Sequence, residues 1–159
     1  MCGVAGLWHR DRRAVDEDAL RRMTCALTHR GPDEEGFHVE AGLGLGHRRL
    51  SIIDLSTGQQ PLCNEDGTVW VAFNGEIFNY LELREDLIKR GHQFRTHSDT
   101  ETLVHLYEEK GLDFVQELNG QFAIALWDRR LRRLVLARDR VGIRPLFHGT
   151  LPDGTVLFR

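Results

Sequence analysis

The chain begins with Met1-Cys2-Gly3-Val4-Ala5-Gly6-Leu7-Trp8, and these residues set the architecture that we expect. Apolar and small residues alternate over residues 4–8, a pattern that predicts a half-buried strand almost at the N-terminus. Cys2 then lies directly before this strand. Once the initiator methionine is removed, Cys2 carries both a thiol and a free α-amine, so a single residue supplies a nucleophile and a base. N-terminal nucleophiles of this kind recur in the cleavage of amides.

Three helices are predicted after this strand, each with a start or a stop signal. They begin at Asp16, near Tyr80 and at Ser98, and they end before Gly31-Pro32, at Gly91 and at Gly111. In the first helix, apolar residues recur at helical spacing behind a favourable aspartate cap. Ser98 and Glu101 match a capping box, in which the serine caps the helix and the glutamate bonds back to it. Glycine suits the helix ends because it adopts the left-handed conformation easily.

Strands are predicted at both ends of the chain and in its middle. They cover residues 37–53, as two or three short strands or one broken hairpin, and then 68–73, 122–128, 134–138, 146–149 and 155–158. Residues 56–67 contain glycine, proline and asparagine and predict a loop. Val69, Val71 and Phe73 share one face of their strand. Strands at both ends with helices between them predict an α+β sandwich.

Length, charge and cysteine content narrow the class of protein. At 159 residues, with 41% hydrophobic and 28% charged side chains, the chain fits one globular domain. A net charge of -3 gives no basic surface for nucleic acid or an anionic membrane, so we expect neither partner. The sequence has no apolar run near the ~20 residues of a membrane span and no signal-peptide pattern. Cys2, Cys25 and Cys63 have no paired spacing, which predicts free thiols in a reducing cytoplasm.

Several polar residues could bind or activate a small substrate. Asn74-Gly75 ends a predicted strand and has two interpretations, a type I′ hairpin turn or an oxyanion hole made of a side-chain amide and a backbone N–H. The second fits better, because Glu76 and the residues after it run into a helix and not into a pairing strand. Considered separately, Arg49 is interpreted as an exposed arginine at a strand end, and Asp99 as a helix cap. Together, Arg49, Glu76 and Asp99 would bind an amino-acid zwitterion while Cys2 attacks its side chain.

Longer motifs carry a family resemblance. They are Met1-Cys2-Gly3-Val4-Ala5-Gly6, Arg30-Gly31-Pro32-Asp33 with Gly36, His47-Arg48-Arg49-Leu50-Ser51-Ile52-Ile53-Asp54, Gln60-Pro61, Phe73-Asn74-Gly75-Glu76-Ile77-Phe78-Asn79, Ser98-Asp99-Thr100-Glu101, Leu118-Asn119-Gly120-Gln121-Phe122-Ala123 and Arg138-Asp139-Arg140-Val141-Gly142-Ile143-Arg144-Pro145-Leu146. With them the chain resembles, over essentially its whole length, the class II glutamine amidotransferase domain of glutamine-dependent asparagine synthetases. Class II members that make glucosamine phosphate or phosphoribosylamine share the N-terminal cysteine and the Asn-Gly pair. Glu76 and Arg49-Leu50-Ser51-Ile52 fit the asparagine synthetase branch better.

The resemblance implies a fold and a role for each matched residue. The fold would be the four-layer αββα sandwich of N-terminal-nucleophile hydrolases. Cys2 would attack the side-chain amide of L-glutamine, form a glutamyl thioester and release ammonia, with Asn74 and Gly75 as the oxyanion hole. The implied substrate contacts are Arg49 for the α-carboxylate, Glu76 and Asp99 for the α-ammonium, and the backbone of Leu50, Ser51, Ile52 and Ile53.

The resemblance also implies a partner domain. In the family, a C-terminal synthetase domain uses ATP and magnesium to amidate aspartate to asparagine, and residues 1–159 would be the glutaminase domain without it. We therefore expect glutamine hydrolysis without asparagine synthesis, no cofactor and no metal in this domain, a cytoplasmic location, and a surface that allows a homodimer. A retained Met1 would block the amine of Cys2 and leave the protein inactive.

The sequence leaves alternatives open for the function and for two other groups of residues. The same glutaminase chemistry could serve an acceptor other than aspartate, or the chain could be a non-catalytic partner module, although the presence of Cys2 and Asn74 argues against the module. Cys25 and His29, four apart in one predicted helix, invite a zinc site. Two further ligands are not visible, so a core cysteine beside a structural histidine is the preferred interpretation. The basic cluster within residues 129–133 predicts a solvated turn and not an RNA site.

Overall fold

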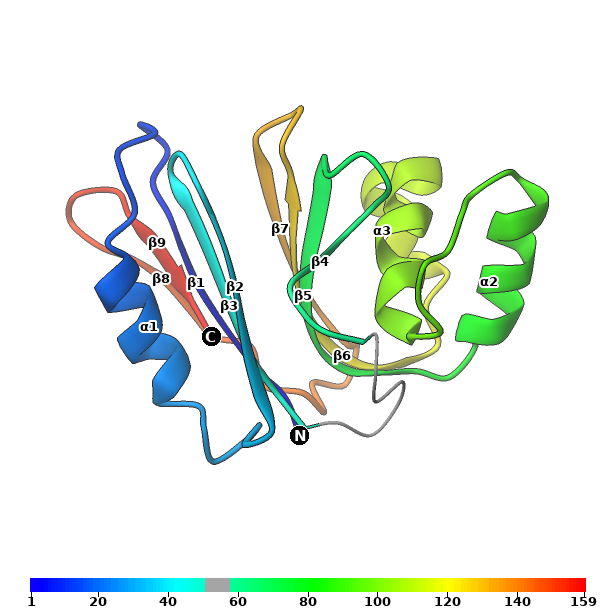
Figure 1. Ribbon diagram of the computed structural model, residues 1–159, viewed down its shortest axis with the longest axis horizontal. Helices are drawn as coiled ribbons and strands as arrows, with labels where there is room; N and C mark the ends of the chain where they lie inside the picture. The colour runs from blue at the N-terminus through cyan, green and yellow to red at the C-terminus, as the bar shows by residue number, and fades with distance from the viewer. Residues whose placement is uncertain (51–57) are drawn as a thin grey trace.

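The computed structural model describes residues 1–50 and 58–159. Two antiparallel sheets face each other and helices lie outside both, so the predicted four-layer αββα sandwich is confirmed (Figure 1). The strands are β1 Gly3–Trp8, β2 Glu34–Glu40, β3 Leu43–Arg49, β4 Leu62–Cys63, β5 Val69–Ile77, β6 Gly120–Asp128, β7 Arg133–Arg138, β8 His148–Thr150 and β9 Val156–Phe158. The helices are α1 Glu17–Cys25, α2 Tyr80–Lys89 and α3 Asp99–Lys110, followed by the 3-10 helix η1 Gly111–Gln116.

The N-terminal strand lies in the middle of the first sheet, whose order is β2-β3-β1-β9-β8. Gly3 of β1 pairs with Arg48 of β3, so Cys2 is carried to the end of β3. Helix α1 covers the outer face of this sheet (Figure 1). It packs closely because a Cβ at Gly46 would lie only 2.0 Å from Thr24 Oγ1. The small residues that alternate along β3 therefore leave room for the helix.

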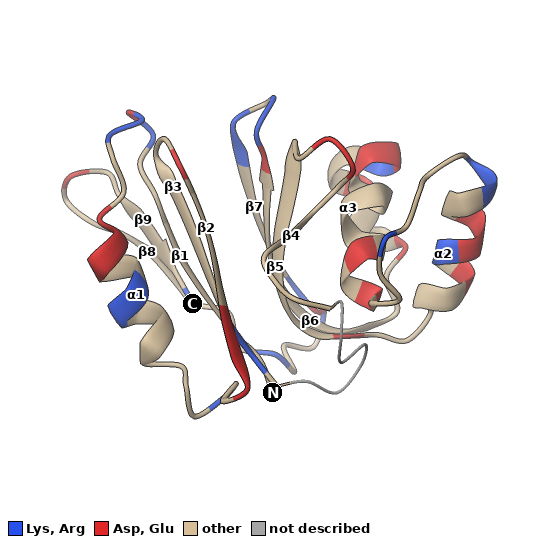
Figure 2. Ribbon diagram, viewed as in Figure 1, with Lys and Arg blue, Asp and Glu red and all other residues tan. Residues whose placement is uncertain are grey.

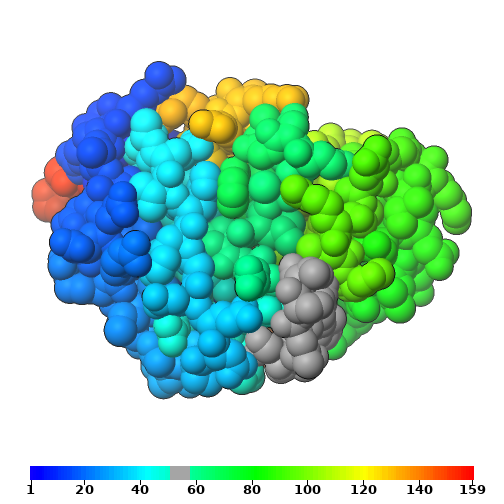
Figure 3. All heavy atoms as spheres, in the orientation of Figure 1, coloured from blue at the N-terminus to red at the C-terminus, as the bar shows by residue number. Residues whose placement is uncertain are grey.

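The second sheet has the order β4-β5-β6-β7 and separates two hydrophobic cores. Val71 and Phe73 belong to the core under the helices, and their shared face is confirmed. Ala72 and Trp127 belong to the core between the two sheets. All four are at most 2% exposed, so both faces of the sheet are buried. In the space-filling view, the cyan segment of β2 and β3 lies directly against the green segment of β4 and β5 (Figure 3).

Strand β5 is longer than the sequence predicts. It continues through Asn74 and Gly75, and Gly75 pairs with Phe122 of β6. The prediction that the strand ends at Asn74-Gly75 is therefore wrong, although α2 begins at Tyr80 as predicted. The pairing strand β6 lies far along the chain, so the sequence around Asn74 gives no sign of it.

The predicted helix ends are mostly confirmed. Asp16 caps α1 by accepting a hydrogen bond from the N–H of Ala19 at 2.9 Å. Helix α1 ends at Cys25, earlier than its apolar spacing predicts. Gly91 and Gly111 follow α2 and α3 with positive φ angles of 105° and 57°, as expected of glycine at helix ends. Within the described residues, no helix is both long and apolar enough to cross a membrane.

The predicted capping box at the start of α3 is only half formed. Ser98 Oγ accepts a hydrogen bond from the N–H of Thr100 at 3.1 Å, which confirms the cap. Glu101 does not bond back to Ser98, because its carboxylate accepts the N–H groups of Arg95 and Thr96 at 2.8 and 2.7 Å. The loop before α3 therefore supplies the hydrogen bonds to Glu101 in place of the backbone of Ser98.

The loops and the remaining strands follow the predictions closely. Strands β2 and β3 form a hairpin, and the predicted strand residues from 51 to 53 lie outside the described residues. The predicted loop at 56–67 contains the short strand β4, a departure from the prediction. The basic cluster lies at the β6–β7 turn, as predicted (Figure 2). Two of its members are paired, Arg129 with Glu40 at 3.2 Å and Arg130 with Asp66.

Candidate active site

One pocket gathers most of the predicted site residues where the ends of β3 and β5 meet the start of α3. The N-terminus lies at this edge of the sandwich, between the two sheets (Figure 1). The pocket lining includes Cys2, Arg49, Leu50, Asn74, Gly75, Glu76 and Asp99. Ser51, Ile52 and Ile53, also predicted to line the site, lie outside the described residues. Residues that the sequence separates by almost a hundred positions thus share one surface.

The half-buried thiol of Cys2 lies against the backbone of Leu50. Its Sγ accepts the N–H of Leu50 at 3.5 Å and is 3.7 Å from the carbonyl oxygen of the same residue. The carbonyl oxygen of Cys2 accepts a hydrogen bond from Arg30 Nε at 3.0 Å. These backbone groups hold the thiol at the edge of the pocket.

Asn74 and Gly75 contribute to the pocket from within β5. Asn74 is 4% exposed, and its side-chain amide has no hydrogen-bond partner among residues 1–50 and 58–159. The amide belongs to the pocket lining, where a substrate oxygen can meet it. Gly75 is fixed by packing, because an added Cβ would lie 2.0 Å from the carbonyl oxygen of Gln121 in β6. The glycine is needed by the sheet whether or not its N–H takes part in chemistry.

Arg49 reaches the pocket from the end of β3 with a buried guanidinium, 4% of the residue being exposed. Its Nη1 pairs with Glu34 Oε2 at 2.9 Å across the β2–β3 hairpin. The interpretation of Arg49 as an exposed strand-end arginine is therefore wrong. A buried guanidinium oriented by one carboxylate is a suitable rigid donor for a second carboxylate.

Asp99 is the first residue of α3 and is 5% exposed. Its Oδ2 accepts the N–H of Ile77 at 3.0 Å, which ties the start of α3 to the end of β5. Burial raises the pKa of Asp99, against the effect of the Ile77 and Thr100 N–H groups, and the nearby charge of Glu76 raises it further. Glu76 itself is exposed at the pocket rim. Two carboxylates this close favour a cation between them.

A buried histidine joins the two sheets behind Arg49. His47 is 1% exposed, and its Nε2 lies 3.1 Å from the carbonyl oxygen of Phe73. Burial lowers the pKa of His47 to about 4, the charge of Arg49 lowers it too, and the Phe73 carbonyl opposes them. The imidazole is therefore neutral at pH 7, with its proton on Nε2 because it faces a carbonyl.

Gln60 and Arg144, whose contacts with a substrate no motif predicts, also line the pocket. Gln60 Oε1 accepts the N–H of Phe73 at 2.6 Å, and its Nε2 donates to Thr100 Oγ1 at 3.2 Å, so it connects β5 to α3. Arg144 is positioned by Asp139, whose carboxylate accepts the Arg144 N–H at 2.9 Å. Both residues occur in quoted motifs, but no local pattern indicates their contacts.

The zinc interpretation of Cys25 and His29 loses its geometric basis. Helix α1 ends at Cys25, so His29 lies beyond the helix and the two side chains do not share a helix face. Both residues are exposed, and His29 Nδ1 lies 3.1 Å from the carbonyl oxygen of Ala26. The preferred interpretation, a core cysteine beside a structural histidine, is also wrong about their burial.

A cysteine at the second position, placed before the central strand of an αββα sandwich, defines the class of N-terminal-nucleophile hydrolases. The family described as glutamine amidotransferase domain matches residues 1–159, and the chain belongs to this family. The predicted resemblance to the class II domain of glutamine-hydrolysing asparagine synthetases is confirmed.

Two curated relatives illustrate the similarity. Asparagine synthetase [glutamine-hydrolyzing] 2 of Bacillus subtilis is 47% identical over 154 residues, which cover 95% of this chain and 20% of the relative. Asparagine synthetase [glutamine-hydrolyzing] 3 of Arabidopsis thaliana is 46% identical over 159 residues, covering 99% of this chain and 27% of the relative. The chain therefore spans only a fifth to about a quarter of the length of these relatives.

Solved structures share the fold at lower identity. Glutamine phosphoribosylpyrophosphate amidotransferase from B. subtilis matches with a TM-score of 0.79 and 23% identity, over 99% of this chain and 41% of that structure. A structure described as the allosteric regulatory enzyme of purine biosynthesis matches with a TM-score of 0.80 and 22% identity, with the same coverage. At this level of identity the match concerns the architecture alone.

Proposed function

We propose that this chain is a glutaminase that hydrolyses L-glutamine to L-glutamate and ammonia through a thioester on Cys2. The observation that carries the proposal is the shared pocket, in which the Cys2 thiol, the buried Asn74 amide and the carboxylate of Asp99 come together. A nucleophile, an oxyanion donor and an ammonium partner are the groups that hydrolysis of an amino-acid amide requires.

The reaction would proceed in two halves. With Met1 removed, the α-amine of Cys2 takes the thiol proton, and the sulfur attacks the side-chain carbonyl carbon of glutamine. Asn74 Nδ2 and the Gly75 N–H donate to the oxyanion, the C–N bond breaks, and the proton held by the amine leaves with ammonia. Water then attacks the thioester carbon, which releases glutamate and returns the proton to sulfur.

The proposed substrate contacts pair each charged group of glutamine with a pocket side chain of opposite charge. The Arg49 guanidinium would hold the α-carboxylate, and Asp99 with Glu76 would hold the α-ammonium. The ammonium would offset the like charges of the two carboxylates and favour ionised Asp99. The backbone of Leu50, Ser51, Ile52 and Ile53 is proposed to complete the site. These contacts select an L-amino acid whose side chain reaches Cys2.

The proposed partner is a synthetase domain in the same polypeptide. The curated relatives are named as glutamine-hydrolysing asparagine synthetases and are several times longer than this chain. We propose that such a domain, with ATP and magnesium, takes the ammonia released here and amidates aspartate, and that residues 1–159 need no cofactor of their own for glutamine hydrolysis. A cytoplasmic location fits the free thiols Cys2, Cys25 and Cys63, and a homodimer is compatible with the proposal.

The proposal is tested with an electrophilic glutamine analogue and intact-mass analysis of the processed protein. One adduct at Cys2, glutamate release without ATP, and loss of both in a folded Cys2→Ala variant are expected. Cys25→Ser and Cys63→Ser are the matched controls and should keep both activities. Adducts confined to Cys25 or Cys63 would contradict the mechanism, and a folded, processed protein without glutamate release would favour the non-catalytic module. An acceptor other than aspartate would leave these results unchanged and appear in assays with the synthetase domain.

A further inference from the structure

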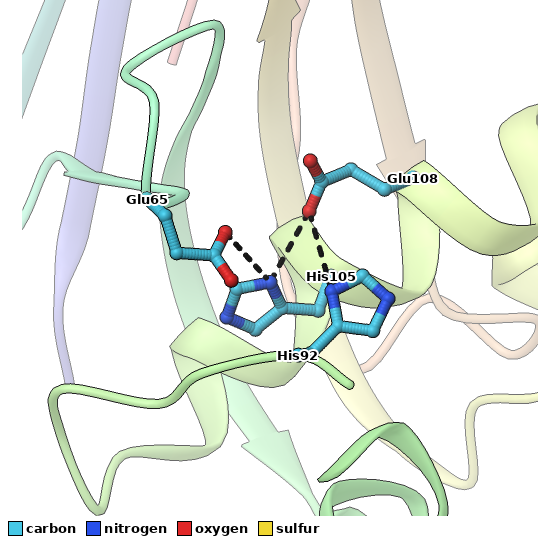
Figure 4. Close-up of side chains that lie close together, drawn as sticks. All are labelled: Glu65, His92, His105 and Glu108. Carbon is cyan, nitrogen blue, oxygen red and sulfur yellow. Dashed lines mark hydrogen bonds and ion pairs between the residues drawn. The ribbon is translucent and has the colours of Figure 1, made fainter. Parts of the chain in front are cut away.

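A cluster of two imidazoles and two carboxylates lies at the far end of α3 from Asp99, outside the pocket described above (Figure 4). His105 and Glu108 lie on α3, Glu65 lies in the turn after β4, and His92 lies in the loop between α2 and α3. One nitrogen or oxygen atom of each side chain lies within 4.8 Å of the corresponding atoms of the others. We propose that these four side chains form a binding site for one divalent transition-metal ion, with Zn²⁺ as the best fit.

Three pairs of inward-facing atoms lie near the spacing of a zinc ligand set, and all four atoms lie within 4.8 Å of one another. His105 Nδ1 is 3.2 Å from Glu108 Oε2 and 3.5 Å from Glu65 Oε2, and His92 Nδ1 is 3.7 Å from Glu108 Oε2. A tetrahedral zinc site with bonds of ~2.0–2.1 Å has ligand atoms about 3.3–3.4 Å apart. Small side-chain rotations therefore suffice to place a metal ion between these atoms.

The two imidazoles are oriented in different ways. His92 Nε2 is 3.1 Å from Glu109 Oε1, whereas His105 Nε2 makes no hydrogen bond within the described residues and lies 3.8 Å from the buried carboxylate of Glu101. For His92, a carboxylate on the outer nitrogen keeps a proton there and leaves the inner nitrogen as the metal ligand. His105 is fully buried, so its ring is fixed in this orientation.

Each of the two carboxylates is oriented by a hydrogen bond to one of its oxygens. Glu108 Oε1 accepts a hydrogen bond from Asn64 Nδ2 at 2.7 Å, and Glu65 Oε1 accepts the N–H of Gln93 at 3.1 Å. Each carboxylate therefore has one oxygen held by the protein and the other directed at His105 (Figure 4). Such support of each ligand from behind is what a metal site requires, and an incidental surface ion pair does not need it.

The ligand types select the class of ion. Imidazole nitrogen with carboxylate oxygen suits zinc and its first-row neighbours, whereas calcium and magnesium prefer oxygen alone. The ion would tie the β4 turn and the α2–α3 loop to the helix that begins with Asp99. Its role is therefore structural.

The test titrates the whole protein, stripped of metal with EDTA, with Zn²⁺ and separately with Co²⁺. One Zn²⁺ per chain is expected, together with the visible absorption of tetrahedral Co²⁺. At a hundredfold excess of Zn²⁺ over Kd, the Tm should rise by about 5–10 °C. Glu65→Gln and His92→Gln should each weaken binding at least tenfold. Both residues retain solvent contact, so the variants are expected to fold without metal.

Matched controls separate this site from incidental binding to thiols. Cys63→Ser, Cys2→Ser and the double variant Cys25→Ser/His29→Gln should keep the stoichiometry and the Kd of the unchanged protein. The inference is overturned if Zn²⁺ does not bind saturably, or if Glu65→Gln and His92→Gln bind it normally while a cysteine variant loses it. The glutaminase assay is not the readout, so the outcome is independent of the proposed function.

Discussion

The imidazole of His47 donates a hydrogen bond to the carbonyl oxygen of Phe73 at 3.1 Å, and this contact joins β3 of one sheet to β5 of the other. It crosses the sandwich directly behind the pocket that holds Asn74 and Arg49. A neutral imidazole is required, because the site is buried and Arg49 lies nearby. The geometry of the pocket therefore depends on the protonation of a residue outside the proposed chemistry.

Acid should destabilise the fold through His47. Its pKa is about 4 in the folded protein and about 6.5 when unfolded, so only the unfolded chain takes up a proton between these values. The stability that neutral His47 contributes to the fold is fully present above pH 6.5 and is lost as the pH falls towards 4. Linkage gives a loss of about 2 kcal/mol between pH 7.5 and pH 5. Urea unfolding at both pH values should therefore show a loss about 2 kcal/mol larger for the protein than for His47→Gln, while the exposed control His29→Gln should behave like the protein. Equal slopes for the protein and His47→Gln would refute the assignment.

Removal of the Asn74 amide should slow catalysis without weakening substrate binding. Asn74→Ala should lower kcat by about 10²–10³-fold, the usual effect of losing one oxyanion donor, with KM for glutamine changed less than about threefold. Gln116→Ala removes an exposed amide in η1 and is the matched control. Steady-state glutamate release measures both constants. A rise in KM at constant kcat would assign Asn74 to substrate binding instead.

Gly75→Ala should lower the stability of the fold. The new Cβ would lie 2.0 Å from the carbonyl oxygen of Gln121, a backbone atom that cannot move without disturbing the β5–β6 pairing. We expect a loss of about 2 kcal/mol and a Tm lower by about 4–8 °C. Gly149→Ala is the control, because no atom lies within 4 Å of its added Cβ. Equal melting temperatures for the two variants would mean that the glycine is not needed by the sheet.

Retention of Met1 should block activity. Met1 lines the pocket, and its Sδ contacts Arg144, so the unprocessed end occupies the space beside Cys2. The amine of Cys2 is then part of a peptide bond and cannot accept the thiol proton. Protein with Met1 intact by mass should release no glutamate above background, and treatment with methionine aminopeptidase should start the reaction. Cys2→Ala treated in the same way should stay inactive. Full activity before treatment would exclude the amine as the base.

Local sequence predicts the strands and helices well because each is set by neighbouring residues. The alternation before and after Ala72 puts its side chain in one core and Phe73 in the other, as the pattern indicates. The error at Asn74-Gly75 has a different origin. Two residues that favour a tight turn lie within a strand because β6, distant in sequence, pairs with them. Tertiary pairing here overrides a local preference.

The candidate site is predictable only in part for the same reason. Motifs indicated Cys2, Asn74 and Asp99, and the pocket brings them together. The pairing of Arg49 with Glu34 depends on the register of the β2–β3 hairpin, which the sequence does not specify closely enough. The contacts of Gln60 and the imidazole–carboxylate cluster on α3 each join separate segments. Spacing along the chain indicates only the i, i+3 pair of His105 and Glu108 within α3.

Asp99→Asn should weaken glutamine binding while leaving the fold intact. The amide keeps the shape of the carboxylate and an oxygen for the Ile77 N–H, but it removes the charge proposed to face the substrate ammonium. A charged hydrogen bond contributes about 1.5–3 kcal/mol, so KM should rise about 10–150-fold with kcat changed less than about threefold. Because burial raises the pKa of Asp99 by disfavouring its charge, the substrate-free variant should be at least as stable as the unchanged protein. Asp18→Asn, on the exposed face of α1, is the control for lost negative charge. An unchanged KM with normal stability would show that the ammonium binds elsewhere.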